Sequence, residues 1–579
     1  MTRMKTVFAV LLLTAIVNVV PQAKAQTLKL LLAGSSAQWQ TLALGAYNSG
    51  NCVSGGVAPC FHYTNSSFNL TDTRPIVKGG TAAVDTGNVW IVWDSSTATG
   101  GPNVWAFIKV DSGVGDRCYF AQPHCNVNTT TFPSPSNIIG STLWGDSSSD
   151  STPPLAVQGL FTSGTALVSA AASDIRPEDA LFATCRANSV LGGGPDGLAG
   201  LGYGTSASGV CPKYGAALKA LEGSDILSAY PGSTSTAHVL DFALSGKDPF
   251  TGTAIPFATT VSVGASPIIF VVSRTGALAG AENITDEEAQ TLFSGTDCDG
   301  SVVGGSGGPI SVYLREMLSG TMNTTEYTVF RHVDLSGKSQ ETGVAAQNPL
   351  SKACTSGGSR YRGVGTGEVV KSVLNSNSIH GNDGIAYTFF SYGNISSLAN
   401  NANYAYLTLD GVDGIWHQYG TTIDPGEPST AGVLPAAANL PASCSGAFPC
   451  PENKIWSGNL SFPNLRNGSY RAWSNLRSIS NGTALAALQL LVKSSNTFVV
   501  TSTPDYVPAT KVGTTDPGLP LLRSHYLQEG IAPVNVSGTG DKGGDAGGCI
   551  LTSTGVAATS DLTTKLVQSQ PGSGCVVVP

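Results

Sequence analysis

The chain has 579 residues, a formal net charge of −8, a charged fraction of only 12% and 70 glycines. This length is enough for two or more domains with sizeable cores, and apolar runs between Gly- and Ser-rich segments indicate a folded, loop-rich chain and not a disordered one. The negative charge argues against nucleic acid or an acidic membrane surface as a partner, so any bound anion must be attracted by charges local to its site.

The N-terminus has the pattern of a secretory signal peptide. Two basic residues precede an apolar run over 7–20, and a small-x-small Ala-Lys-Ala pattern stands before Gln26. We therefore expect residues 1–25 to be a leader and the mature protein to be periplasmic or secreted. The residue after the cut is not Cys, and no later run reaches the roughly 18 apolar residues that span a bilayer, so we expect neither a lipid anchor there nor membrane insertion.

Twelve cysteines in an exported chain predict disulfides. The close pairs are Cys52 with Cys60, Cys118 with Cys125, Cys444 with Cys450, and Cys549 with Cys575 at the tail. The pairing of Cys185, Cys211, Cys298 and Cys354 stays open. Neither Cys-x-x-Cys nor His-x-x-x-His occurs, and the seven histidines are scattered, so we expect no metal and no cofactor.

The first predicted unit is a strand followed by a helix. An apolar strand over 28–32 runs into the turn Gly34-Ser35-Ser36-Ala37, and helical spacing continues through Trp39. The backbone N–H groups after Gly34 would then point to wherever the strand ends.

The stretch 87–113 alternates apolar and polar residues on both sides of a Gly-Gly pair, which predicts a hairpin. We interpret its tryptophans, Trp90, Trp93 and Trp105, as packing residues and not as a stacking platform for sugars or bases.

A further strand ends at Ser173-Asp174, and Pro177 followed by two acidic residues opens a helix.

From residue 255 the pattern predicts two apolar β segments separated by 264–267. A helix with Thr285 as its N-cap and Gly295 after its end follows. A strand over 310–314 then leads through a loop into a helix. Further strand and helix patterns recur up to 400 and again over 470–495, whereas the tail after 501 is Gly-rich with little periodicity.

Arg315 lies four residues before Ser319-Gly320-Thr321, at the start of a predicted helix. Free backbone N–H groups, hydroxyls and a guanidinium that can donate a forked pair of hydrogen bonds would suit a tetrahedral oxyanion. The alternative is an ordinary Ser/Thr helix cap beside a surface arginine.

Five stretches occur in an order that resembles the PstS-like phosphate-binding members of the type II periplasmic solute-binding proteins. They are AGSSAQWQ after the first strand, AASDIRPEDA, IPFATTVSVGASPIIFVV, ITDEEAQTLFSG and VYLREMLSGTMNTTE. The resemblance covers the elements from about residue 27 to 409 and implies an α/β, two-lobed type II periplasmic-binding-protein fold with β-rich insertions and a loop-rich C-terminal extension.

The resemblance also implies a ligand site. Ser35, Ser36 and the Ala37 amide would bind one face of the anion. Asp174 would accept the proton of a protonated phosphate, and Arg315, Ser319, Gly320 and Thr321 would hold the anion from the other lobe. A buried carboxylate accepts a hydrogen bond only from an oxyanion that still carries a proton, so sulfate would be penalised.

The family also offers a serine from a loop after the second strand, and Ser66 and Ser67 are the two candidates for it here. Between the arginine and Ser-Gly-Thr the family has small or acidic residues, whereas this chain has Glu316, Met317 and Leu318.

The expected division is a first lobe over 26–255 with an inserted hairpin region, a second lobe over 256–400, and a return to the first lobe with a C-terminal extension of unknown role over 401–579. The resemblance implies a non-enzymatic protein that captures phosphate, or a related protonated oxyanion, for the permease of an ABC importer.

Two other functions stay open. One is an exported surface or scaffold protein that kept the fold without serving transport. The other is a secreted serine hydrolase, since the segment 304–308 formally fits Gly-x-Ser-x-Gly, although it lacks the strand-to-helix setting of a nucleophile elbow.

Overall fold

The computed structural model describes residues 27–175, 258–330, 351–436 and 462–508, with shorter gaps inside these ranges, and the pairs 550–551 and 576–577. The predicted signal peptide and the helix predicted after Pro177 lie outside the described residues. So do Cys185, Cys211, Cys444, Cys450, Cys549 and Cys575.

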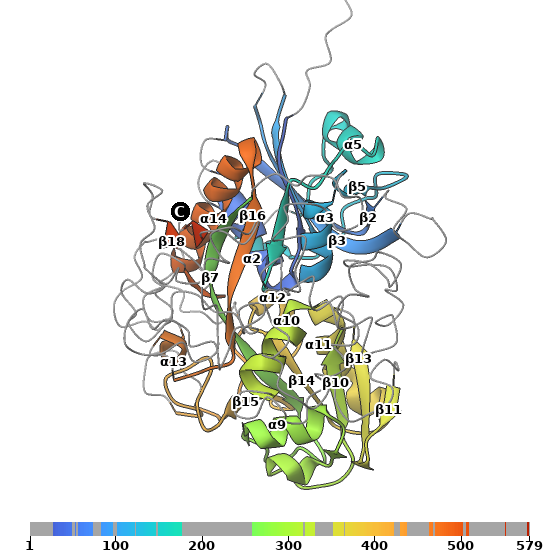
Figure 1. The fold of residues 1–579 in the computed structure, drawn as a ribbon, viewed down its shortest axis with the longest axis vertical. Helices are drawn as coiled ribbons and strands as arrows, with labels where there is room; N and C mark the ends of the chain where they lie inside the picture. The colour runs from blue at the N-terminus through green and yellow to red at the C-terminus, as the bar shows by residue number, and fades with distance from the viewer. Residues whose placement is uncertain are drawn as a thin grey trace, which may run out of the picture.

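The described chain forms two α/β lobes, one above the other in Figure 1, which confirms the predicted fold class. In the first lobe, β1 (Thr27–Gly34) pairs in parallel with β4 (Asn103–Lys109) on one side and with β6 (Ala170–Ser173) on the other. β16 (Trp473–Ser480) then pairs antiparallel with β6, so a segment from late in the chain completes the first sheet.

The second lobe repeats this arrangement. β10 (Ser311–Arg315) lies in parallel between β13 (Ser359–Gly363) and β14 (Gly384–Phe389). β7 (Thr259–Ser273) pairs antiparallel with β14 and with β15 (Tyr404–Leu409). In both lobes, therefore, a strand arriving from the other lobe is inserted antiparallel beside three parallel strands.

β7 is one continuous strand, so the prediction of two segments separated by 264–267 is wrong. Its first half pairs with β16 and its second half with β14 and β15, which makes it a crossing strand between the lobes. Gly264 is needed for packing and not for a turn, because a Cβ there would lie 2.3 Å from the Val507 carbonyl oxygen and 2.4 Å from a Tyr506 ring carbon.

Helices pack against both sheets, and several of them begin directly after a strand ends. In the first lobe these are α2 (Ser36–Asn48), α3 (Ser112–Phe120) and α14 (Gly482–Thr501), and in the second lobe α9 (Asp286–Phe293), α10 (Gly320–Thr325) and α11 (Gly365–His380). The predicted N-cap of α9 is confirmed: the Thr285 side chain accepts from the Glu288 N–H and Glu288 accepts from the Thr285 N–H. No helix in the described part of the chain is long and apolar enough to cross a membrane.

The predicted hairpin is confirmed as β3 (Ala83–Asp94) paired antiparallel with β4. β2 (Cys60–Asp72) adds a third antiparallel strand. Since β4 also pairs with β1, the hairpin is continuous with the main sheet of the first lobe. Trp90, Trp93 and Trp105 are all buried, as expected for packing residues.

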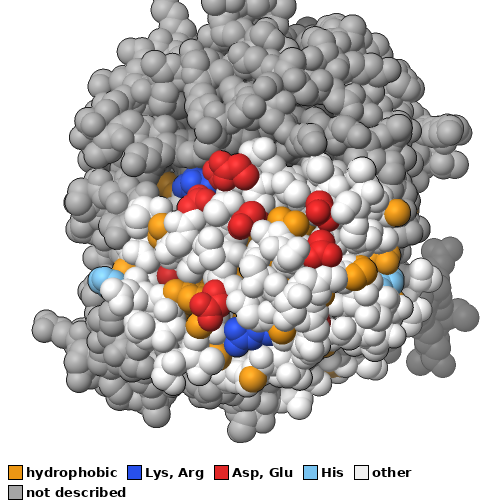
Figure 2. Space-filling model, turned by 90° about the horizontal axis from the view of Figure 1, so that it is seen from below, with side chains coloured by type: hydrophobic (Ala, Val, Ile, Leu, Met, Phe, Trp, Pro, Cys, Tyr) orange, Lys and Arg blue, Asp and Glu red, His pale blue; other side chains and the backbone are white. Residues whose placement is uncertain are grey.

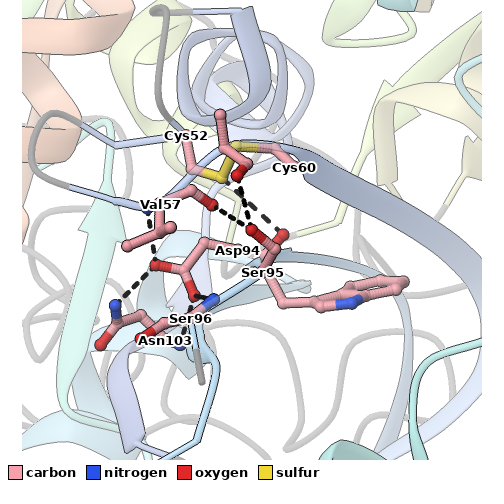
Figure 3. Close-up of a disulfide and its surroundings, with 9 residues drawn as sticks. Cys52, Val57, Cys60, Asp94, Ser95, Ser96 and Asn103 are labelled. Atoms are coloured by element: carbon pink, nitrogen blue, oxygen red, sulfur yellow. Dashed lines mark hydrogen bonds between the residues drawn. A yellow bond between two sulfur atoms is a disulfide. The ribbon is translucent and has the colours of Figure 1, made fainter. Parts of the chain in front are cut away.

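Asp94 closes the end of this hairpin beside a disulfide (Figure 3). Its carboxylate accepts from the Asn103 backbone N–H at 2.8 Å, from the Asn103 side chain at 2.6 Å and from the Val57 N–H at 3.1 Å. The disulfide Cys52–Cys60 closes the loop that contains Val57, so Asp94 and the disulfide both fix this loop.

Two predicted disulfides, Cys52–Cys60 and Cys118–Cys125, are confirmed, and Cys298 pairs with Cys354, which the sequence left open. The remaining elements are β5 (Asn126–Asn128), α4 (Ser141–Trp144), α5 (Leu155–Thr162), β8 (Asn283–Ile284), β9 (Asp297–Cys298), a 3-10 turn (Gly300–Val303), a π-helical turn (Glu326–Phe330), β11 (Ser351–Ala353), β12 (Ser356–Gly357), α12 (Tyr392–Ile395), α13 (Pro463–Arg466), β17 (Val507–Pro508), β18 (Ile550–Leu551) and β19 (Val576–Val577).

Candidate functional site

Three polar segments follow parallel strands of the first lobe. Ser35 and Ser36 follow β1, Asp111 and Ser112 follow β4, and Asp174 follows β6. These strands are direct neighbours and run in one direction. Their carboxyl ends therefore meet at one edge of the sheet, where open α/β sheets bind ligands.

Asp174 is the centre of the first-lobe contribution. It is 3% exposed, and its Oδ1 accepts a short hydrogen bond from the Ser35 hydroxyl. Its backbone N–H donates to Ser112 Oγ at 3.2 Å, and its carbonyl accepts from Ser474 at 2.7 Å. Sequence-distant elements thus hold the backbone and side chain of Asp174 in one orientation.

Burial raises the pKa of Asp174 to about 6, because desolvation outweighs the hydrogen bond from Ser35 and the positive charge of Arg315, which both lower it. The carboxyl group is therefore ionised above this pH and protonated below it.

Arg315 is the centre of the second-lobe contribution. It lies at the end of β10 and is 2% exposed. Its Nη1 donates to Thr321 Oγ1 at 3.1 Å and to Thr366 Oγ1 at 2.8 Å. The alternative interpretation of this stretch required a surface arginine, and the burial of Arg315 shows that this part of it is wrong.

The Glu316 carboxylate accepts hydrogen bonds from one edge of the Arg315 guanidinium. Arg315 Nε donates to Glu316 Oε2 at 2.8 Å and Nη2 to Oε1 at 2.6 Å, while the Gly365 N–H also donates to Glu316 at 3.0 Å. Burial alone would raise the pKa of Glu316, but the charge of Arg315 and these hydrogen bonds lower it to about 2. In sequence Glu316 is only a departure from the family pattern, whereas in the structure it orients the arginine.

The two lobes touch at this point. Ser36 Oγ lies 3.0 Å from Thr366 Oγ1, and Arg315 Nη2 lies 3.7 Å from Asp111 Oδ1. A Cβ built on Gly320 would lie 2.6 Å from both Asp174 Cβ and Ser112 Oγ. The backbone of α10 can approach Asp174 this closely only because residue 320 is glycine.

We use the name interlobe site for the eight residues that the sequence nominated, all of which are buried and described: Ser35, Ser36, Ala37 and Asp174 from the first lobe, and Arg315, Ser319, Gly320 and Thr321 from the second. Direct contacts link Ser35 to Asp174, Asp174 to Gly320, and Arg315 to Thr321.

Two further nominated groups also have intramolecular partners. The Ala37 N–H donates to Ser35 Oγ at 3.1 Å, and Ser319 Oγ accepts from the Met322 N–H at 3.3 Å. Ser319 is therefore a helix-capping residue, as the alternative interpretation held.

Sequence reasoning missed three residues of this region: Asp111, Ser112 and Thr366. A signal existed for the first two, because the sequence Asp-Ser-Gly follows a strand and opens α3 in the same way as Gly-Ser-Ser opens α2. Ser66 and Ser67, the serines nominated for this role, are exposed at a bulge of β2.

A second cation lies nearby at the end of β4. Lys109 Nζ is 5.2 Å from the centre of the Trp39 ring. Burial, with the positive charges of Arg315 and Lys371, lowers the pKa of Lys109 to about 8. By contrast, the described part of the second-lobe face in Figure 2 carries scattered acidic side chains and few basic ones. Arg315 and Lys109 place positive charge beside the residues that lie between the lobes.

The segment with the Gly-x-Ser-x-Gly pattern does not have the strand-to-helix setting of a nucleophile elbow. It lies in a loop after the 3-10 turn, and the exposed Ser306 hydroxyl donates to the Ala279 carbonyl at 3.2 Å. Among the described residues, no group of three or more His, Cys, Asp or Glu side chains could hold a metal ion.

No protein-family model and no curated protein matches the sequence. Several solved structures are similar. An ABC-type phosphate transport receptor from Vibrio cholerae is 12% identical, with a TM-score of 0.23 over 42% of this chain and 68% of that chain. A putative phosphate ABC transporter substrate-binding protein from Clostridium perfringens, solved with bound phosphate, is 16% identical, with a TM-score of 0.23 over 42% and 64%.

A high-affinity periplasmic phosphate-binding protein called PfluDING is 13% identical, with a TM-score of 0.33 over 95% of this chain and 99% of that chain. Identities of this size transfer no residue roles to this chain.

Proposed function

We propose that this protein captures hydrogen phosphate at the interlobe site. The observation that carries the proposal is the buried pair of opposite groups on the two lobes: the carboxyl group of Asp174 and the guanidinium of Arg315, with Gly320 in contact with Asp174. An oxyanion that lies between them gains a charge-assisted hydrogen bond from Arg315 and needs a proton of its own to bond the Asp174 carboxylate.

Selectivity follows from this asymmetry. Above a pH of about 6 Asp174 is ionised, so it accepts a hydrogen bond from hydrogen phosphate. Sulfate carries no proton at this pH and would leave the buried carboxylate facing another negative charge.

We propose further that the protein works outside the cytoplasm and delivers its ligand to the permease of an ABC importer. Three disulfides among the described residues fit an oxidising compartment. Lobe closure around the ligand would be a hinge motion at the crossing strands β7 and β16. The division into a first lobe over 26–255, a second lobe over 256–400 and a returning segment with extension over 401–579 is part of this proposal.

The competing function is an exported surface or scaffold protein with the same fold. Specific contacts favour it: the Ala37 N–H and the Nε–Nη2 edge of Arg315 already have partners within the protein. A site whose donors are satisfied internally binds an anion only by exchanging those bonds.

Titration calorimetry separates the two functions. The protein is unfolded, washed free of anion, refolded and titrated with phosphate and then with sulfate at pH 8. Micromolar or tighter binding of phosphate, with sulfate at least a hundredfold weaker, supports capture of phosphate. Absence of heat with both anions, in a sample that unfolds cooperatively, favours the scaffold function.

A further inference from the structure

A third carboxyl group, that of Asp111, reaches the Arg315 guanidinium from the opposite lobe. Asp111 precedes α3, where an aspartate ordinarily accepts hydrogen bonds from the first turn of its own helix. Here it makes no side-chain capping bond. Its Oδ1 lies 3.7 Å from Arg315 Nη2, so the side chain is directed across the lobes.

The guanidinium already has an ionised partner. Arg315 donates two bonds to Glu316, at 2.8 and 2.6 Å, and the Nη2 atom that bonds Glu316 is the one nearest Asp111. Glu316 is fully buried and Asp111 is 4% exposed. One positive charge therefore faces two carboxyl groups in a poorly solvated space, and a second ionised carboxylate would be uncompensated.

The other charged groups around Asp111 and Glu316 do not compensate the excess of negative charge that two ionised carboxylates would create. Asp85 and Glu316 act on Asp111 with negative charge and Arg315 with positive charge. Asp174 adds a further carboxyl group that interacts with Arg315. Lys109 interacts with the positive charges of both Arg315 and Lys371, and Arg117 acts on Asp85. Burial and the negative charge of Glu316 raise the pKa of Asp111 well above its ordinary value, against the lowering by Arg315.

We propose that Asp111 is protonated when the lobes are together and donates a hydrogen bond to Glu316 across the interface, so that closing the lobes on an anion takes up one proton. With the lobes apart, Asp111 is hydrated and, like an ordinary aspartate, ionised at neutral pH. Closure at neutral pH then requires the proton.

This inference rests on the proposed capture of phosphate, because the anion is what brings the lobes together. Its consequence is that phosphate affinity becomes linked to pH. Where the open form is ionised and the closed form is protonated, affinity rises by up to about tenfold for each unit by which the pH falls. A binding protein of this kind would hold its anion more tightly in acidic surroundings.

The test is titration calorimetry of phosphate binding at pH 7 in buffers with different ionisation enthalpies. The dependence of the observed heat on the buffer gives the number of protons taken up. We compare the wild type with Asp111→Asn, which keeps a hydrogen-bond donor toward Glu316 but cannot take up a proton. Asp299→Asn, in an exposed loop of the second lobe, is the matched control.

We expect the number of protons taken up to fall by about one in Asp111→Asn and to be unchanged in Asp299→Asn. A second variant, Glu316→Gln, removes the negative charge that favours the protonated form of Asp111, so uptake should fall there too. If either folded variant binds phosphate with the same proton number as the wild type, the inference is wrong. If the wild type shows no binding heat in any buffer, the proposed function is overturned instead, and proton uptake linked to phosphate is overturned with it.

Discussion

The first-lobe face of the interlobe site consists of hydroxyl groups around a carboxyl group, whereas the second-lobe face is built around a guanidinium. Ser35 and Ser112 bond the side chain and the backbone of Asp174. Glu316 and two threonine hydroxyls orient Arg315. The first face can only choose between anions, because a carboxylate penalises any anion that lacks a proton, and the second face supplies the attraction. Affinity and selectivity should therefore be separable by mutation.

The largest effect should come from Arg315→Ala. A hydrogen bond to a charged group contributes about 1.5–3 kcal/mol, so losing the bond from Arg315 should raise the phosphate dissociation constant by about tenfold to a hundredfold. The variant should also unfold more easily by about 3–5 kcal/mol, because Glu316 is left buried and unpaired. Calorimetry and urea unfolding measure the two quantities.

Arg274→Ala is the matched control for this variant. Arg274 belongs to the same lobe and donates to the carbonyls of Ala402 and Ala431. A similar loss of phosphate affinity in Arg274→Ala would show that the effect is a general weakening of the second lobe.

Asp174→Asn should change selectivity more than affinity. An amide donates a hydrogen bond to a fully deprotonated oxygen, so sulfate binding should strengthen and phosphate binding should weaken by about tenfold, the cost of roughly one neutral hydrogen bond. The measured quantity is the ratio of the two dissociation constants, which should approach one.

Asp505→Asn is the control, since burial raises the pKa of Asp505 to about 6 as well, but its partners are Thr41, Ser391 and Tyr392. In Asp505→Asn the ratio of the sulfate and phosphate dissociation constants should stay that of the wild type. A wild-type ratio in Asp174→Asn would contradict the role assigned to Asp174.

Gly320→Ala should act on both faces at once. The added methyl group would press against Asp174 and Ser112, so the lobes could not approach fully. We expect phosphate affinity to fall by about tenfold, with an overpacking cost of roughly 1–3 kcal/mol. Gly367→Ala is the control because a Cβ at Gly367 meets nothing within 4 Å. Equal affinities for the two variants would show that the contact at Gly320 does not matter for binding.

The smallest effect is a dependence of selectivity on pH. Because the pKa of Asp174 is raised to about 6, the group is protonated below that pH and can donate to sulfate. We expect competition of sulfate with phosphate to be weak at pH 8 and to grow by several-fold at pH 5. Competition that does not change between these pH values would contradict a titrating Asp174 at the site.

Local patterns in the sequence were sufficient to predict the strand-to-helix units, the cap at Thr285 and two disulfides, because each depends on neighbouring residues. Local patterns were not sufficient where the structure depends on contacts between residues that are far apart in the sequence. The hairpin pattern gave no indication that β4 also pairs with β1, and so the contribution of Ser112 was missed. Gly264 has the usual appearance of a turn residue, but the nearby Tyr506 and Val507 are what require glycine there.

The same limit applies to the site itself. The Arg-to-Ser-Gly-Thr spacing drew attention to Arg315, which the structure buries where the lobes meet, while its role in binding stays a prediction. The direction of the Glu316 side chain could not be known from its position next to the arginine. Thr366, which is 51 residues away along the chain, carries no sequence signal that relates it to Arg315.

The most direct measurement is a crystal structure of the protein grown in saturating phosphate after removal of endogenous anion. The account predicts one phosphate between Asp174 and Arg315, within hydrogen-bond distance of both and of Ser36 or Thr321. A structure in which the two lobes meet as they do here with no anion between them, or in which phosphate binds elsewhere, would contradict it.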